Sequence, residues 1–355
     1  MESNIERIRK ALLEWKLDAM LVTSPTNRLF ATGFQSSAGA LLVTGRGAWF
    51  YTDSRYYEAA CAAITDASVY KTTDDEPYNK QIKTILAEYG IISVGLEESA
   101  LTYLEYLDWR RKLKIKPVRA QKLISGLRMK KSLGDLENLK KAQRVAEKSF
   151  EEILPLISTN ITEKELAAEL LYRFMKNGAD DKSFDTIAVS GKKSSMPHGV
   201  PGDVKIGKGF LTIDFGVRLN GWCSDTTRTL CVGKPDEEMV RVYDTVLKAQ
   251  EAGIKAVRAG VKGSAVDAAA RDVIEAAGYG EYFGHGFGHG LGIEVHEAPR
   301  AAKTSKDILQ AGAVISAEPG IYLPGRYGVR IEDVLYVTEN GCENITNLTK
   351  KLIVI

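Results

Sequence analysis

Glycine occupies every second position from residue 284 to residue 292, in the run Gly-His-Gly-Phe-Gly-His-Gly-Leu-Gly. Each glycine inside a helix or strand costs roughly 0.5–1 kcal/mol relative to alanine, so the run disfavours both. His285 and His289 have the spacing of a zinc-binding helix, but the same glycines argue against that helix. A flexible linker is the alternative, and the apolar flanks of the run disfavour it. The run therefore predicts a backbone kept bare so that another group can approach it closely.

Length, charge and cysteine content restrict the class of protein. A chain of 355 residues fits two domains, and a formal charge of +2 gives no signature of a polyanion-binding protein. The most basic run, residues 110–119, is interpreted as an amphipathic edge strand rather than a nucleic-acid arm. No stretch has the length of a membrane span, and the N-terminal residues predict an amphipathic helix rather than a signal peptide. The cysteines are scattered without a paired motif: Cys61, Cys223, Cys231 and Cys342. We therefore expect a cytoplasmic protein with neither nucleic acid nor a membrane as a partner.

The pattern of the chain changes near residue 125. Residues 1–124 alternate helical and strand-like segments, which predicts a smaller α/β domain, and they contain no histidine. Residues 125–355 are mostly strand-like after two long helices, and this segregation predicts an α+β domain on an antiparallel sheet. The helices expected in this second domain cover residues 133–157, 163–176, 237–258 and 265–277.

Acidic residues interrupt an apolar hairpin in the second domain. Asp214 lies in an apolar strand, and Asn220-Gly221 is a strong signal for a two-residue turn. With that turn, Asp214 lies opposite Thr227, and Asp225 becomes its diagonal neighbour on the same face. Two such carboxylates repel each other in an apolar setting, and a cation between them removes that penalty.

The C-terminal region repeats this arrangement with Glu318 and Glu332, on two apolar strands joined by a glycine-rich turn. Taken singly, each acid is more simply a surface or ion-paired residue. Combined with the glycine run and its histidines, the four acids predict a metal site. Carboxylates with one imidazole suit manganese, iron or cobalt better than structural zinc. A formal charge of −4 on four carboxylates balances two divalent cations. We expect manganese first, with cobalt, zinc or iron as alternatives.

Five stretches resemble the metal-binding motifs of the dinuclear metallopeptidases with the pita-bread fold. This superfamily includes methionine aminopeptidase, aminopeptidase P and prolidase. The stretches are residues 212–216, 224–229, 284–292 with 295–297, 316–320 and 330–334. The resemblance implies that the metal ligands are Asp214, Asp225, His289, Glu318 and Glu332, with Asp225 and Glu332 at the bridging positions.

The N-terminal half narrows the resemblance. Residues 27–34 and 52–56 resemble the creatinase-like N-terminal domain, which Xaa-Pro peptidases and creatinase carry and methionine aminopeptidases lack. Residues 190–199 resemble the Asn-Ser-x-x-Pro-His loop of the family, with Lys193 in place of the usual Asn. We therefore expect a creatinase-like domain over residues 1–124 and a pita-bread domain over residues 125–355.

The resemblance implies an exopeptidase that hydrolyses the Xaa-Pro bond with a hydroxide bridging two divalent metals. In this interpretation Glu318 relays a proton, His198 and His296 contact the peptide and its oxyanion, and His285 shapes the pocket. For these histidines a role in the core or behind the ligands is the alternative. The resemblance also implies a homodimer, with the small domain restricting entry to the site.

Arg300 bears on the length of the substrate. It stands four residues after His296, a position resembling the carboxylate-binding arginine of prolidases, which favours Xaa-Pro dipeptides over longer peptides. A surface arginine paired with a nearby acid is the alternative, and so is an aminopeptidase P acting on longer Xaa-Pro peptides. A creatinase-like amidinohydrolase and a non-catalytic binding protein are disfavoured because all five ligands are present.

Overall fold

The computed structural model describes residues 2–355 and divides into two compact units, Met1–Arg128 and Met129–Ile355. The division falls slightly beyond residue 124 because helix α6 (Gln121–Met129) continues through that position. Within the described residues, no helix combines the length and the apolar character that crossing a membrane requires.

The N-terminal unit is a mixed six-stranded sheet with strand order β4-β3-β2-β1-β5-β6. Helix α1 forms because Ile5, Ile8 and Leu12 recur on one face and are buried, while Ser3 caps the Glu6 N–H. The strands are β1 (Ala19–Val22), β2 (Ala40–Thr44), β3 (Ala48–Thr52), β4 (Ser68–Lys71), β5 (Ser93–Leu96) and β6 (Lys116–Arg119). The helices preceding α6 are α1 (Asn4–Trp15), α2 (Pro25–Thr32), α3 (Tyr57–Ala63), α4 (Tyr78–Glu88) and α5 (Tyr103–Leu113).

The interpretation of residues 110–119 as one strand was wrong in its first half. Residues 110–113 form the last turn of α5, and within this run only residues 116–119 form a strand, β6, which lies at one edge of the sheet. Basic side chains are favourable there because they lie at the negative end of the helix dipole. Lys114 ends the helix with a φ of 55°.

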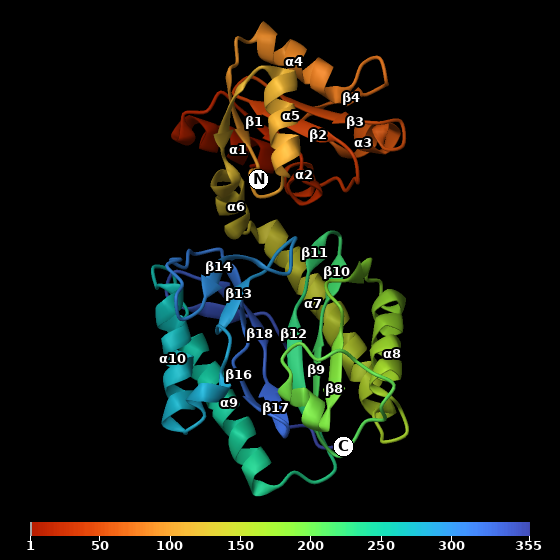
Figure 1. Ribbon diagram of the computed structural model, residues 1–355, viewed down its shortest axis with the longest axis vertical. Coiled ribbons are helices and arrows are strands. Elements are labelled where there is room, and N and C mark those ends of the chain that lie inside the picture. The colour runs from red at the N-terminus through yellow and green to blue at the C-terminus, as the bar shows by residue number, and fades with distance from the viewer. Residues whose placement is uncertain (1) are drawn as a thin grey trace. The chain divides into compact units, whose positions relative to one another are not determined.

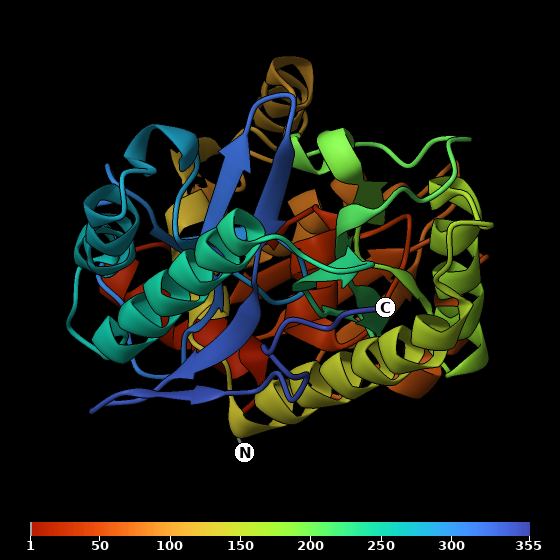
Figure 2. The ribbon, with the colours of Figure 1, turned by 90° about the horizontal axis from the view of Figure 1, so that it is seen from below.

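The C-terminal unit is built from antiparallel strands with helices on both sides. Figures 1 and 2 show α7 and α8 on one side of the strands and α9 and α10 on the other. The helices are α7 (Leu133–Ile153), α8 (Glu163–Lys176), α9 (Glu237–Ala256) and α10 (Gly263–Ala276). The first strands are β7 (Asp181–Lys182), β8 (Ile187–Ser190), β9 (Gly209–Phe215), β10 (Val217–Leu219), β11 (Trp222–Cys223) and β12 (Thr226–Val232). The later strands are β13 (Gly288–Gly290), β14 (Glu297–Ala301), β15 (Val314–Ala317), β16 (Gly320–Leu323), β17 (Tyr327–Arg330), β18 (Asp333–Val337) and β19 (Cys342–Asn344).

Each pair of helices covers its own hydrophobic core. One core joins α7 and α8 to β8, β9 and β12, with Phe150 stacked on Phe215 at 5.0 Å between ring centroids. The other joins α9 and α10 to β15 through β18. Strand β12 meets the second half directly, because the Glu332 N–H donates to the Thr227 carbonyl at 3.1 Å. Polar groups buried along this seam therefore come from both halves.

Candidate metal centre

The first acidic hairpin has the predicted register. Asp214 of β9 lies opposite Thr227 of β12, and Asn220 and Gly221 form the turn with φ values of 51° and 81°. Positive φ at both central residues is the conformation that a tight two-residue hairpin requires. Asp225 lies just before β12, where the ladder is interrupted. The prediction that Asp214 pairs opposite Thr227 is therefore confirmed.

The second acidic hairpin is interrupted in the same way. Strand β15 pairs with β18 and β16 with β17, and the ladder breaks between the two pairs. Because Ala317 faces Asp333 and Gly320 faces Arg330, one register continues across the break, and Glu318 and Glu332 occupy facing positions within it. Both hairpins thus present their acids where the backbone ladder opens.

The glycine run contains a short strand, which corrects the expectation that it would form neither helix nor strand. Strand β13 lies between β14 and β15. A Cβ atom on Gly288 would lie 2.0 Å from the Ser316 carbonyl oxygen, and one on Gly290 would lie 2.3 Å from that of Ala298. The groups that approach the bare backbone are therefore the neighbouring strands. Their close approach holds His289, the middle residue of β13, beside the acids.

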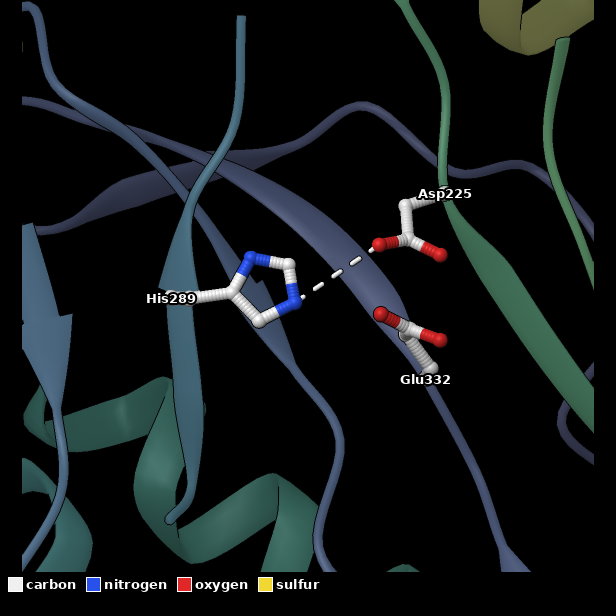
Figure 3. A group of neighbouring side chains, drawn as sticks. All are labelled: Asp225, His289 and Glu332. Carbon is white, nitrogen blue, oxygen red and sulfur yellow. Dashed lines mark ion pairs between the residues drawn. The ribbon is translucent and has the colours of Figure 1, made fainter. Parts of the chain in front are cut away.

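His289, Asp225 and Glu332 converge on one point (Figure 3). Each offers one ligand atom, and these atoms all lie within 4.8 Å of one another. The His289 Nε2 atom lies 3.7 Å from Asp225 Oδ2 and 3.1 Å from Glu318 Oε1. Nδ1 contacts the Gly290 carbonyl at 3.1 Å, and because a carbonyl only accepts, Nδ1 carries the hydrogen. That contact fixes the tautomer and directs Nε2 towards the acids, as in metal-binding histidines.

The buried acids carry more negative charge than the surrounding protein compensates. Asp225 and Glu332 are 4% and 1% exposed. Burial, together with the charges of Glu332, Asp214 and Glu318, raises the pKa of Asp225 well above its usual value. Burial and the charges of Glu318 and Asp214 likewise raise the pKa of Glu332 well above its usual value. Among the described residues, Glu332 Oε1 and Asp214 Oδ1 are buried without a hydrogen-bond partner. Unpartnered oxygens, mutual repulsion and one directed imidazole fit a divalent metal centre.

Glu318 behaves differently because it lies against His289. Burial alone would raise the pKa of Glu318, but the hydrogen bond and charge of His289 outweigh burial and lower it to about 2. The same pairing raises the pKa of His289 against the effect of burial. Glu318 also accepts a hydrogen bond from the Ser316 hydroxyl at 3.1 Å. Glu318 is therefore held as a carboxylate, the form that can accept a proton.

Arg330 is a member of this site that the sequence analysis missed. The residue is 4% exposed, and its guanidinium donates to Asp214 Oδ2 at 2.6 Å, to Thr227 Oγ1 at 3.0 Å and to the Tyr322 hydroxyl at 2.8 Å. Tyr322 in turn lies 2.9 Å from His285 Nε2. The sequence did contain a signal for Arg330, a cation within an apolar strand two residues before Glu332. A buried arginine requires acidic partners, so this position could have been assigned to the acidic site.

The remaining predicted residues lie at different distances from the ligands. The His296 ring packs edge-on against His289 with 4.3 Å between centroids, and its side chain is exposed. Burial lowers the pKa of His296, and the charges of His289 and His198 act in the same direction. His198 is exposed and follows Pro197, whose carbonyl accepts a hydrogen bond from Arg330. His285 is directed at Tyr322, and burial lowers its pKa, so its neutral ring supports the arginine network. Arg300 is exposed on β14.

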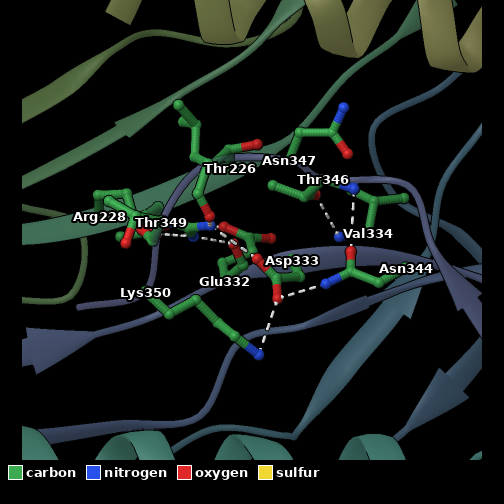
Figure 4. Close-up of polar contacts among 12 residues, drawn as sticks. Thr226, Arg228, Glu332, Asp333, Val334, Asn344, Thr346, Asn347, Thr349 and Lys350 are labelled. Carbon is green, nitrogen blue, oxygen red and sulfur yellow. Dashed lines mark hydrogen bonds and ion pairs between the residues drawn. The ribbon is translucent and has the colours of Figure 1, made fainter. Parts of the chain in front are cut away.

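A second buried network of polar side chains holds the backbone of Glu332 and the neighbouring Asp333 (Figure 4). Arg228 pairs with Asp333 at 2.8 Å and donates to the Glu332 and Leu348 carbonyls. The Asp333 carboxylate also accepts a hydrogen bond from Asn344 Nδ2 at 2.8 Å and forms an ion pair with Lys350 Nζ at 3.3 Å. The Glu332 backbone and the residue after it, Asp333, are thus fixed to the C-terminal segment.

Metal-free protein is expected to lose stability as pH rises from about 5.5 to about 8. The folded state raises the pKa values of Asp214, Asp225 and Glu332, so at these three acids it binds more protons than the unfolded chain, and this outweighs the opposite effect of the lowered pKa values of His285 and His296. Stability gained from raised pKa values is present at low pH and is lost as pH rises through them, and the raised pKa of His289 acts in the same direction. Urea unfolding of chelator-treated protein at both pH values measures this, and Asp225→Asn should weaken the dependence. A metal-free protein that is more stable at pH 8 would contradict the argument.

Comparison with known proteins gives matches along nearly the whole chain. Residues 137–339 match metallopeptidase family M24, and residues 4–130 match the creatinase/prolidase N-terminal domain. The Xaa-Pro dipeptidase of Pyrococcus horikoshii is 35% identical over 356 residues, covering 99% of each chain. Among solved structures, the Xaa-Pro dipeptidase from Bacillus anthracis superposes with a TM-score of 0.95 at 38% identity, covering 99% of both chains. The X-Pro aminopeptidase from Thermotoga maritima gives 0.92 at 33% identity, covering 98% of this chain and 100% of that one.

These matches confirm the fold class expected from the sequence, a creatinase-like N-terminal domain followed by an α+β pita-bread domain. All five candidate ligands lie within the residues that match the second family.

Proposed function

The chain belongs to metallopeptidase family M24, and we propose that within this family it is an Xaa-Pro dipeptidase. The observation that carries the proposal is the convergence of Asp225, His289 and Glu332, with Asp214 and Glu318 adjoining them. Relatives named as Xaa-Pro dipeptidases match over almost their entire length, which supports the substrate class. An amidinohydrolase or a non-catalytic binding protein would not need this complete donor set.

The five residues are proposed to hold two divalent ions, with manganese favoured by the excess of oxygen ligands. Such ions supply Lewis acidity, which lowers the pKa of a bound water and polarises a carbonyl group. The proposed ligands are Asp214, Asp225, His289, Glu318 and Glu332.

The side chains around the ligands suit peptide hydrolysis. Glu318 is held ionised and is proposed to take up the proton of the attacking water and pass it to the leaving proline nitrogen. The exposed rings of His296 and His198 are proposed to donate hydrogen bonds to the peptide and to the oxyanion that develops on the scissile carbonyl. His285 is proposed to bound the pocket from its position against Tyr322.

Arg300 is proposed to bind the C-terminal carboxylate of a dipeptide. Its side chain is exposed and forms no ion pair with residues 2–355. Its backbone N–H donates a hydrogen bond to the Asp307 carboxylate at 2.8 Å. The alternative of a surface pair with a neighbouring acid therefore gains no support. A planar guanidinium can hold a carboxylate through two parallel hydrogen bonds.

The direct test compares substrate lengths. Purified protein loaded with Mn²⁺ should cleave Xaa-Pro dipeptides faster than Xaa-Pro-Xaa peptides of the same first residue. The opposite preference would identify an Xaa-Pro aminopeptidase, the class named for the Thermotoga maritima structure. Cleavage of neither substrate would reject both.

Arg300→Ala is expected to raise KM for dipeptides by roughly 10- to 100-fold while leaving longer Xaa-Pro peptides nearly unchanged. Only the dipeptide places a carboxylate immediately after the proline. Arg300→Lys should recover part of the affinity, and Lys303→Ala, which removes an exposed cation from the same segment, serves as the control. Equal losses on both substrate lengths would reject Arg300 as the anchor.

The cellular setting and assembly are further proposals. A cytoplasmic location is supported by four free cysteines, since reduced thiols are usual in that compartment. A homodimer is proposed from the family resemblance, and light scattering of the purified protein tests it.

A further inference from the structure

Lys193 stands where the family loop resembled by residues 190–199 usually carries Asn, and the proposed function gives it no role. Its Nζ lies 2.8 Å from Glu163 Oε2 in an ion pair. The Glu163 side chain is 0% exposed and that of Lys193 is 30% exposed. Glu163 is the first residue of α8, directly after the N-cap Thr162. The pair therefore joins a fixed helix start to the loop that carries His198.

The Glu163 carboxylate accepts from three places on that loop, residues 190–202, which we call the histidine loop. Oε1 accepts the Ser190 N–H at 2.8 Å and the Ser190 hydroxyl at 3.3 Å. Oε2 accepts the Gly202 N–H at 3.1 Å as well as the Lys193 ammonium. One buried carboxylate thus fastens both ends of the histidine loop and a point between them.

The energetics of burial make this contact specific for one loop conformation. A buried carboxylate costs several kcal/mol unless hydrogen bonds and an opposite charge compensate it. Within residues 2–355, every side-chain partner of Glu163 comes from the histidine loop, so the compensation is complete only when the loop is closed on α8. Lys193 supplies the only positive charge among these donors.

The other side of the histidine loop rests on β17. The Gly328 N–H donates to Ser194 Oγ at 3.0 Å, and Arg330 Nη1 donates to the Pro197 carbonyl at 3.2 Å. His198 follows Pro197 directly, and its side chain is exposed. The histidine ring is therefore held on a loop fixed at α8 by charge and at β17 by the arginine that also binds Asp214.

We propose that Glu163 and Lys193 are positioning residues for His198, acting by clamping the histidine loop between α8 and β17. The inference rests on the proposed function in one respect, that His198 contacts the peptide. Among the described residues, the side-chain hydrogen bonds and ion pairs of Glu163 and Lys193 involve none of the five candidate ligands, so removing the clamp should move His198 without changing the ligand set.

The clamp itself can be tested without any assay of activity. Hydrogen–deuterium exchange should show protected amides at Ser190 and Gly202 in the metal-loaded enzyme and faster exchange at both in Glu163→Gln and Lys193→Met. Lys192→Met removes the neighbouring exposed lysine and serves as the control. Unchanged exchange in both variants overturns the clamp, whatever the enzyme hydrolyses.

The positioning role is tested by a double-mutant cycle on kcat/KM for an Xaa-Pro dipeptide. Lys193→Met should lower kcat/KM by roughly 10- to 100-fold, the cost of misplacing a group by about 1 Å, with metal content unchanged. Lys193→Arg should restore most of the activity. In a His198→Ala background, Lys193→Met should have almost no further effect, because residues that act through one another are not additive.

The outcomes separate the two proposals. Additive losses in the cycle, or normal activity of Lys193→Met beside a slow His198→Ala, overturn the positioning role and leave the dipeptidase proposal intact. A wild-type enzyme that cleaves no Xaa-Pro substrate rejects the proposed function, while the exchange experiment still decides whether the clamp exists.

Discussion

Asp225→Asn is expected to reduce the metal content well below two equivalents per chain and to lower kcat by about 10³-fold or more. Asp225 lies 3.7 Å from His289 and feels the charges of Glu332, Asp214 and Glu318, so it is the acid most surrounded by other candidate ligands. Asparagine keeps the shape but loses the charge, which a pair of divalent ions requires.

Elemental analysis after reconstitution, combined with dipeptide hydrolysis, measures this effect. Glu332→Gln should have the same effect, because Glu332 is another buried candidate ligand and its Oε1 atom has no hydrogen-bond partner among the described residues. Asp244→Asn, an exposed acid on α9, should leave both quantities unchanged. A stable and fully active wild-type enzyme holding one metal equivalent would refute the dinuclear centre.

His296→Ala is expected to lower kcat by roughly 10²–10³-fold while the enzyme keeps its metal. The His296 ring lies 4.3 Å from the ring of His289, but it is exposed, whereas the five candidate ligands are buried or half-buried. This geometry suits a donor facing the reacting carbonyl better than a ligand.

The purified His296→Ala variant distinguishes an oxyanion donor from a metal ligand. Metal content is measured by elemental analysis and turnover at saturating dipeptide, and His296→Gln tests whether another donor at this position recovers part of the rate. If His296→Ala loses its metal and regains normal turnover when metal is added in excess, His296 is a ligand and not an oxyanion donor.

Parts of this site were predictable because they depend on short-range chemistry. The Asn220-Gly221 turn fixes its hairpin locally, and from it the pairing of Asp214 with Thr227 followed correctly. The helix over residues 163–176 was also predicted with its exact bounds, since Thr162 and Glu165 form a capping box at its start.

Other parts depend on contacts between distant segments. The partners of Arg330 come from residues 197, 214, 227 and 322, and no local pattern brings these together. Strand β13 was missed because its glycines are explained only by the strands on either side of it. The basic run at residues 110–119 was misread because a helix end and an edge strand both favour basic side chains.

The interrupted hairpins also determine where this chain can tolerate a change in length. Surface turns usually accept insertions and deletions, because few contacts depend on them. Here one added residue between Val217 and Cys223 would slip the register and turn Asp225 to the opposite face of the hairpin. The same holds for the turn between β16 and β17, which sets Glu318 against Glu332. A change in the length of either turn is therefore expected to misplace a candidate ligand, unlike a change in an ordinary surface loop.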